Sequence, residues 1–155
     1  MHDIESLYEI FRQFPNITID SRCCPPESLF FALKGKNNDG NRFAEKALQN
    51  GAEYAVIDDP DVAAGDRYIV VPDVLTAMQQ LAAHHRRQMK ARIIAVTGTN
   101  GKTTTKELIA TVLAKQYKVL YTERNHNNHI GVPLTLLRLT EEDEFGVIEM
   151  GANHK

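Results

Sequence analysis

A glycine-bearing loop in the second half of the sequence has the residue types that bind phosphate groups. It lies within the stretch RIIAVTGTNGKTTTKELIATVLAK, residues 92–115, between an apolar run and a helical pattern. Gly98 and Gly101 permit backbone conformations that expose amide groups to an anion. The first amides of the following helix add a partial positive charge at the same place. The sequence therefore predicts a phosphate-binding loop that joins a strand to a helix.

The two residues after the second glycine indicate which phosphates are bound. Lys102 can reach the outer phosphates of a nucleotide, and the Thr103 hydroxyl is placed to bind Mg²⁺. The loop departs from the full G-x-x-x-x-G-K-[ST] pattern, because Val96 stands where the first glycine belongs. A glycine-rich strand-to-helix turn with a solvated lysine is the alternative interpretation.

Further polar groups follow two other apolar strands. The loop TERNHNNHIGVP, residues 122–133, contains several amide and imidazole side chains. It follows the carboxyl end of one strand, which is where α/β sheets bind ligands. An asparagine-rich turn is the alternative. The H-x-x-H spacing of His126 and His129 also suggests a zinc site, but no cysteine or carboxylate nearby in the sequence completes the set of ligands. Glu149 ends the apolar strand VIEM, where phosphate-loop enzymes hold Mg²⁺ with a carboxylate, unless it is a solvated strand-end glutamate.

The elements around these residues alternate between strands and helices. The first half is predicted to hold helices over 3–14, 41–51 and 74–90 and strands over 16–22, 29–33, 54–58 and 67–71, with Asn41 as one N-cap. The second half is predicted to hold a buried strand over 93–97, further strands over 118–122 and 145–150, and helices over 102–116 and 132–139. The expected fold class is α/β: a small N-terminal α/β domain over 1–88, then the first βαβαβ part of a P-loop ATP-binding domain with a parallel sheet over 89–155.

Composition narrows the class of protein. The chain has 18 basic and 20 acidic residues and a net charge of -2, so no basic surface for nucleic acid or anionic membrane is indicated. No apolar run approaches the ~20 residues that span a bilayer, and the N-terminus lacks the basic region of a secretory signal. Cys23 and Cys24 are adjacent and precede two prolines, so two ordinary thiols are favoured over a redox pair. We expect a protein of the cytoplasm.

Together these residues resemble the Mur ligases, the ATP-dependent amide-bond ligases of peptidoglycan synthesis. The shortened loop TGTNGKTTT is characteristic of that family, and NHNNHIGVPLTLLRL followed by VIEMGANH is most similar to the branch that adds D-alanyl-D-alanine. The N-terminal stretches TIDSR and SLFFALKGKNNDGNRFAEKALQNGAEYAVID are similar to the UDP-binding domain of the same family. The alternatives are the sister ligase that adds the third amino acid, a folate polyglutamating enzyme, and a non-catalytic nucleotide-binding module.

The resemblance implies a reaction and a set of site residues. ATP would phosphorylate the C-terminal carboxylate of UDP-N-acetylmuramoyl-tripeptide, and the amine of D-alanyl-D-alanine would then attack the acyl phosphate, with release of ADP and phosphate. The ATP phosphates would be bound by Gly98, Thr99, Asn100, Gly101, Lys102, Thr103 and Thr104, and the catalytic residues would be Lys102, Asn127 and Asn128. Mg²⁺ would be held by Thr103 and Glu149, and the UDP part would face Ser21, Arg22, Lys36, Asn37 and Asn38. Because the family pattern continues past Lys155, we expect an N-terminal fragment that is inactive alone.

Overall fold

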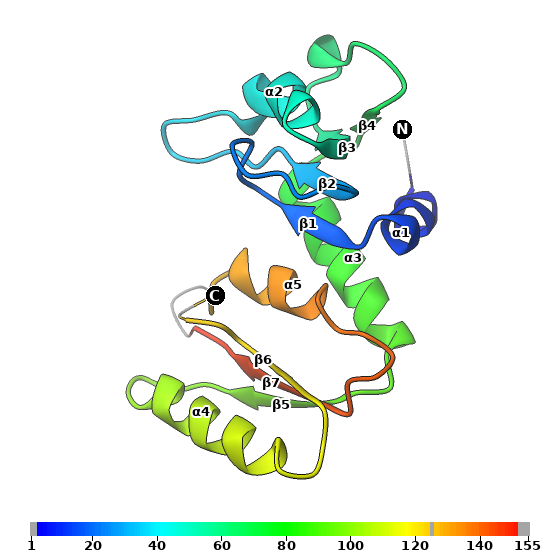
Figure 1. Ribbon diagram of the computed structural model, residues 1–155. Helices are drawn as coiled ribbons and strands as arrows, with labels where there is room; N and C mark the ends of the chain where they lie inside the picture. The colour runs from blue at the N-terminus through cyan, green and yellow to red at the C-terminus, as the bar shows by residue number, and fades with distance from the viewer. Residues whose placement is uncertain (1–2, 125, 152–155) are drawn as a thin grey trace. The chain divides into compact units, whose positions relative to one another are not determined.

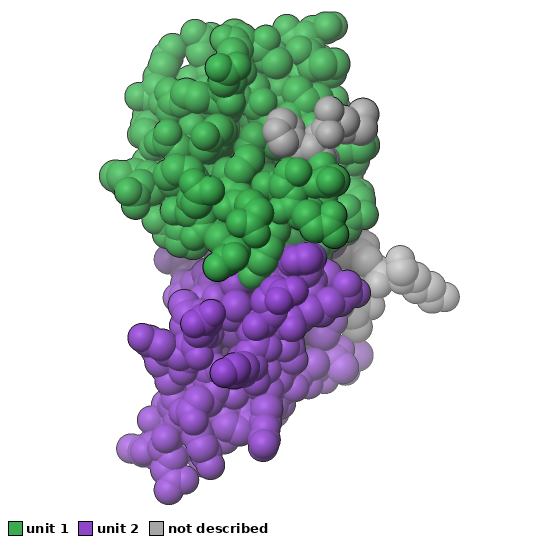
Figure 2. All heavy atoms as spheres, turned by 90° about the vertical axis from the view of Figure 1, so that its right-hand side faces the viewer, with its two compact units in different colours: residues 1–81 green, residues 82–155 purple. Residues whose placement is uncertain are grey.

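The computed structural model describes residues 3–124 and 126–151 (Figure 1). The chain forms two compact units, residues 1–81 and residues 82–155 (Figure 2). Their boundary lies inside helix α3 (Val74–Gln88). The sequence places a domain boundary after residue 88, and that position stays a prediction. Both units combine helices with a parallel sheet, which confirms the predicted fold class.

The first unit is built on a four-stranded parallel sheet. Its strands are β1 (Asn16–Thr18), β2 (Ser28–Phe31), β3 (Ala52–Ile57) and β4 (Tyr68–Val70), in that order across the sheet. Its helices are α1 (Ile4–Gln13), η1 (Gly40–Phe43), α2 (Ala44–Gln49) and η2 (Pro60–Val62), followed by the start of α3. Because all neighbouring strands are parallel, the loops after β1, β2 and β3 leave the sheet at one edge.

Asn41 is not the helix N-cap that the sequence predicts. The backbone of η1 makes a 3-10 turn whose N-cap is Asp39, and α2 begins only at Ala44. The buried Asn41 amide instead donates to Asp58 Oδ1 at 2.7 Å. A buried amide needs a partner, and the carboxylate at the end of β3 supplies one.

The second unit is built on a three-stranded parallel sheet in the order β5-β7-β6. Its elements are β5 (Arg92–Val96), α4 (Lys102–Leu113), β6 (Val119–Tyr121), α5 (Gly131–Leu136) and β7 (Phe145–Glu149). This sequence of elements confirms the predicted strand–helix–strand–helix–strand unit. Since β7 enters between the two earlier strands, the loops after β5 and β6 and the end of β7 meet at one edge (Figure 1).

The central strand β7 forms the core of the second unit. Val147 is fully buried, and Ala110 of α4 packs against it together with Val96 of β5. Gly146 leaves room for a neighbouring side chain, because a Cβ at that position would lie 2.7 Å from Ile93 Cδ1. Close packing around β7 therefore sets the position of its last residue, which belongs to the candidate site.

Strand β5 and helix α4 keep apolar surface open to solvent. The prediction of a continuously buried strand over 93–97 is wrong for this chain, because β5 is an edge strand of the described sheet and its Ala95 is exposed. On α4, Leu108 and Val112 are 63% and 70% exposed. This helix is nevertheless no membrane span, because none of the helices in residues 3–124 and 126–151 has the length and apolar character to cross a bilayer.

Candidate functional site

The predicted phosphate loop joins β5 to α4. Gly98 and Gly101 have φ angles of 145° and 75°, at which any side chain would strain the backbone. Gly101 is the N-cap residue of α4 and has no side chain that accepts from the first helix amides. The first turn of α4 therefore presents backbone N–H groups of the kind that bind anions.

Lys102 begins α4, and its side chain folds back over the loop. Its Nζ donates to Gly98 O at 2.6 Å. This contact places the ammonium beside the backbone amides of the loop and the start of the helix. An anion bound at this loop would meet both the ammonium and the helix amides.

Glu149 ends β7 and is only 1% exposed. The Thr103 hydroxyl donates to its carboxylate, at 3.1 Å and 3.4 Å from the two oxygens. On the other side, Asn127 Nδ2 donates to Glu149 Oε1 at 2.8 Å. A hydroxyl and a carboxylate side by side are the hard oxygen ligands that Mg²⁺ prefers. The structure brings the two predicted metal ligands together, and their binding of Mg²⁺ stays a prediction.

The neighbouring asparagines of the loop after β6 make different contacts. Asn127 joins the loop to the Glu149 carboxylate, as described above. Asn128 Oδ1 instead accepts from two backbone amides at the start of α5, at 3.1 Å and 2.7 Å. Asn128 thus binds the backbone that leads into α5, while Asn127 contacts the acidic centre. The catalytic assignment of both residues stays a prediction.

The zinc alternative gains no support from the described residues. Among residues 3–124 and 126–151, no group of three or more His, Cys, Asp or Glu side chains is placed to hold a metal ion. Within these described ranges, the spacing of His126 and His129 is therefore not accompanied by a group of further ligands of the kind that zinc needs.

The turn after β1 holds Ser21 and Arg22. The guanidinium of Arg22 donates to both carboxylate oxygens of Asp20, at 2.9 Å and 2.8 Å. These hydrogen bonds lower the pKa of Asp20 to about 2. Ser21 is buried, and its carbonyl accepts from Asn50 Nδ2 at 2.7 Å. The turn therefore presents an exposed guanidinium in a fixed orientation.

The loop after β2 carries the other residues predicted to face UDP. Lys36, Asn37 and Asn38 are exposed at its tip. Gly35 N donates to Asn38 O at 2.8 Å and closes the turn. This loop and the turn after β1 leave the same edge of the parallel sheet, so the predicted residues share one edge. Their binding of UDP stays a prediction.

Asp58, which sequence reasoning missed, anchors the base of this loop. Its carboxylate pairs with Lys34 Nζ at 2.9 Å and accepts hydrogen bonds from Asn41 Nδ2 at 2.7 Å and from Val74 N at 3.4 Å. Burial opposes ionisation of the carboxyl, but the hydrogen bonds from Lys34 and Asn41 outweigh it, so the pKa of Asp58 is lowered. The one available signal in the sequence is an aspartate at the end of the apolar run YAVI.

Two family models match the chain. The model of the Mur ligase family, catalytic domain, matches residues 13–86, and that of the Mur ligase middle domain matches residues 96–155. These two ranges contain all the predicted site residues of both units. The chain belongs to the Mur ligase family.

Curated relatives of this Mur ligase chain are D-alanyl-D-alanine-adding enzymes. The UDP-N-acetylmuramoyl-tripeptide–D-alanyl-D-alanine ligase of Haemophilus influenzae is 43% identical over 147 residues, which are 92% of this chain and 32% of the relative. The ligase of the same name from Escherichia coli is 44% identical over 140 residues, 90% of this chain and 30% of the relative. The chain thus spans about a third of the length of the relatives it matches.

Solved structures of the same ligases have a similar fold. The MurF structure of Acinetobacter baumannii has a TM-score of 0.82 at 39% identity, covering 90% of this chain and 31% of that one. The MurF ligase of Thermotoga maritima, solved in complex with ADP, has a TM-score of 0.82 at 29% identity, covering 99% and 34%. A UDP-N-acetylmuramoyl-L-alanyl-D-glutamate–2,6-diaminopimelate ligase has a lower TM-score of 0.56 at 25% identity, covering 88% and 31%.

Lys106 is a second residue of this Mur ligase chain that sequence reasoning missed. It lies on α4, one turn after Lys102, and is 0% exposed. Its Nζ donates to Thr122 O at 2.7 Å and to Arg124 O at 3.2 Å, and it lies 3.7 Å from Glu149 Oε2. The signal in the sequence is a lysine in register with the inward-facing apolar residues of the helix, a position where an unpaired charge would be costly.

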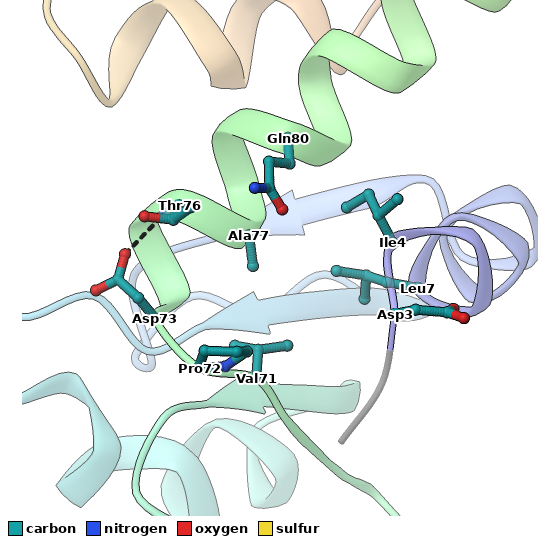
Figure 3. A pocket seen from close by; sticks show the side chains of 9 residues that line it. All are labelled: Asp3, Ile4, Leu7, Val71, Pro72, Asp73, Thr76, Ala77 and Gln80. Carbon is teal, nitrogen blue, oxygen red and sulfur yellow. Dashed lines mark hydrogen bonds between the residues drawn. The ribbon is translucent and has the colours of Figure 1, made fainter.

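A pocket of about 200 Å³ lies between α1 and the start of α3 in the first unit of this Mur ligase chain (Figure 3). Its lining residues are Asp3, Ile4, Leu7, Val71, Pro72, Asp73, Thr76, Ala77 and Gln80. Asp73 Oδ1 accepts from Thr76 N at 2.7 Å, so this carboxylate caps α3. The lining contains neither Ser21 nor Arg22, and the pocket therefore adds nothing to the predicted UDP site.

Proposed function

We propose that this chain is the N-terminal part of an ATP-dependent amide-bond ligase that joins D-alanyl-D-alanine to UDP-N-acetylmuramoyl-tripeptide. The observation that carries the proposal is the convergence of the phosphate loop, the Thr103 hydroxyl and the Glu149 carboxylate at one sheet edge. The substrate class follows from the relatives, which are ligases of that name in Haemophilus influenzae and Escherichia coli. The proposed reaction consumes ATP, and we place it in the cytoplasm.

The donor set fits the phosphates of ATP and Mg²⁺. Backbone amides at the start of α4 and the Lys102 ammonium suit the phosphates, and the oxygens of Thr103 and Glu149 suit the metal ion. Bound MgATP supplies the phosphoryl group that activates the carboxylate of the tripeptide. Lys102 neutralises negative charge on the outer phosphates during this transfer, and Asn127 holds the Glu149 carboxylate in place.

The proposed reaction has two steps. A carboxylate oxygen of the tripeptide attacks the terminal phosphorus of ATP, which forms an acyl phosphate and releases ADP. The amine of D-alanyl-D-alanine then attacks the acyl carbon, and the tetrahedral species collapses to an amide with release of phosphate and a proton. Such chemistry depends on positioning and charge neutralisation more than on a covalent intermediate with the protein. The cluster around Glu149 suits such positioning, because Thr103 and Asn127 both donate hydrogen bonds to its carboxylate.

The first unit is proposed to hold the UDP part of the tripeptide substrate. Arg22 presents a guanidinium that Asp20 orients, and Lys36 adds a second cation on the neighbouring loop. A planar guanidinium and an ammonium are both groups that bind the oxygens of a diphosphate. Ser21, Asn37 and Asn38 are proposed as additional hydrogen-bonding partners from the same loops.

The sister ligase that adds the third amino acid is the main competing function. The solved ligase of that kind aligns with a TM-score of 0.56 at 25% identity. The D-alanyl-D-alanine ligases from Acinetobacter baumannii and Thermotoga maritima both align at 0.82. This difference supports the dipeptide-adding reaction over the sister reaction.

The test uses the full-length protein that contains this stretch. ADP and phosphate are measured with ATP, UDP-N-acetylmuramoyl-tripeptide and D-alanyl-D-alanine together, and then with each substrate omitted in turn. We expect ADP release that requires both the tripeptide and the dipeptide, and a product that carries the pentapeptide. Turnover with a free third amino acid and the UDP-dipeptide instead would assign the sister reaction. Tight ATP binding without any binding of the UDP substrate would favour an unrelated nucleotide-binding module.

A further inference from the structure

Lys106 is a buried cation whose nearest acceptors belong to the turn after β6. Its Nζ is 2.7 Å from Thr122 O and 3.2 Å from Arg124 O, whereas Glu149 Oε2 is farther away at 3.7 Å. An ammonium has three donors and no acceptor, so it suits a place where several oxygens converge. A lysine at an inward position of a helix would be costly without such partners. Its main contacts are therefore with the turn, and the carboxylates of Glu149 and Glu107 are longer contacts, both at 3.7 Å.

The turn that Lys106 holds has a strained backbone. Arg124 has a φ of 52°, in the left-handed region that residues other than glycine seldom occupy. The carbonyl of this same residue accepts from Lys106. Shortly after the turn, Asn127 donates to Glu149, and its carbonyl accepts from Gly151 N at 2.6 Å. The turn that Lys106 contacts thus lies shortly before the residue that joins this loop to the acidic centre.

We propose that Lys106 is a positioning residue of the ligase. Its ammonium binds the carbonyls of Thr122 and Arg124, holds Arg124 in the left-handed conformation, and so keeps Asn127 in contact with Glu149. The inference rests on the proposed function, because it assigns Lys106 to the same phosphoryl-transfer site. It goes beyond that function, since Lys106 neither lies in the phosphate loop nor is a proposed metal ligand.

The first test replaces the ammonium and keeps the aliphatic stem. In the full-length protein, Lys106→Met should lower kcat by about 100-fold, because a misplacement of about 1 Å at a reacting site has an effect of that order. The KM for the UDP substrate should change by less than about twofold, since the first unit is untouched and the variant alters the site of phosphoryl transfer. Lys115→Met is the matched control, because Lys115 is exposed just past the end of α4, and its kcat should stay unchanged.

The second test separates positioning from a general loss of stability. In the Lys106→Met background, Arg124→Gly should restore kcat by about tenfold, because glycine adopts the left-handed conformation without strain. Arg124→Ala removes the same side chain and keeps the strain, so it should restore nothing. Equal kcat values for the glycine and alanine double variants would overturn the proposal. If Lys106→Met fails to fold, Lys106→Gln takes its place with the same expected outcomes, because glutamine is shorter and carries no charge.

A readout that does not depend on activity distinguishes this inference from the proposed function. Hydrogen exchange of the Gly151 amide reports the contact with Asn127 O. In the full-length protein, Lys106→Met should speed this exchange at least about tenfold, while Lys115→Met should not change it. If the wild-type protein has no ligase activity but the exchange responds as expected, the proposed function fails and the positioning role stands. Unchanged exchange together with a near-normal kcat would remove Lys106 from the site.

Discussion

Replacing Lys102 by methionine in the full-length protein tests whether phosphoryl transfer belongs to the second unit and UDP binding to the first. The substitution keeps the aliphatic stem and removes the ammonium that lies over the phosphate loop. Lys102 donates to Gly98 O at 2.6 Å, which places its charge beside the loop amides. If it neutralises the transferring phosphoryl group, its loss should raise the activation free energy by about 3–4 kcal/mol, which lowers kcat by about 10²–10³.

The effect of this substitution on folding should be much smaller. In the folded chain the ammonium makes one described hydrogen bond, and the side chain is only half-buried. Removing a single partly exposed charged hydrogen bond should reduce the free energy of unfolding by about 1 kcal/mol. A loss of kcat without a comparable loss of stability therefore assigns the ammonium to the chemistry.

Lys36→Met is the reciprocal variant in the same assay. Initial rates of ADP release give kcat and the KM values for ATP and for the UDP substrate, and urea unfolding gives the stability. Lys36→Met should raise the KM for the UDP substrate and leave kcat nearly unchanged, whereas Lys102→Met should show the opposite pattern. Near-normal kcat for Lys102→Met would refute its role in phosphoryl transfer. A loss of affinity for the UDP substrate in that variant would show that the two sites are wrongly divided.

Three further predictions concern the chain itself. The isolated 155-residue chain, given ATP, UDP-N-acetylmuramoyl-tripeptide and D-alanyl-D-alanine, should release no phosphate above background, and measurable turnover would contradict its interpretation as a fragment. Asp58→Ala should reduce the free energy of unfolding in urea by about 2 kcal/mol, because Lys34 and Asn41 lose their shared partner; a change below about 0.5 kcal/mol would contradict this anchoring role. Burial lowers the pKa of His85 below its usual 6.5, and the neutral ring donates from Nε2 to Leu139 O at 2.8 Å. Since the unfolded chain then binds the proton more readily, stability should fall as the pH drops through about 6.5 towards the folded-state pKa, and His85→Phe should flatten that slope in urea titrations between about pH 8 and about pH 5.

Local chemistry in the sequence is sufficient to predict the phosphate loop. Gly98 and Gly101 stand where the backbone needs positive φ, and Lys102 and Thr103 follow at the start of a helix. These features depend only on neighbours in the chain, so they can be read without knowledge of the fold. The alternation of apolar strands with helices after residue 89 likewise predicts the parallel sheet of the second unit, as observed.

Contacts between distant segments are decided only by the tertiary structure. Glu149 meets Thr103 because β7 enters the sheet between β5 and β6, and no local pattern specifies that order. Asn127 and Asn128 are adjacent and of the same type, yet Asn127 donates to Glu149 whereas Asn128 accepts from a backbone amide at the start of α5. Lysine is a residue type usually found at the surface. Lys106 is nevertheless buried, because the carbonyls of Thr122 and Arg124 in the turn after β6 accept hydrogen bonds from its ammonium. Such roles depend on oxygens supplied from far along the chain, and strand pairing alone brings those oxygens within reach.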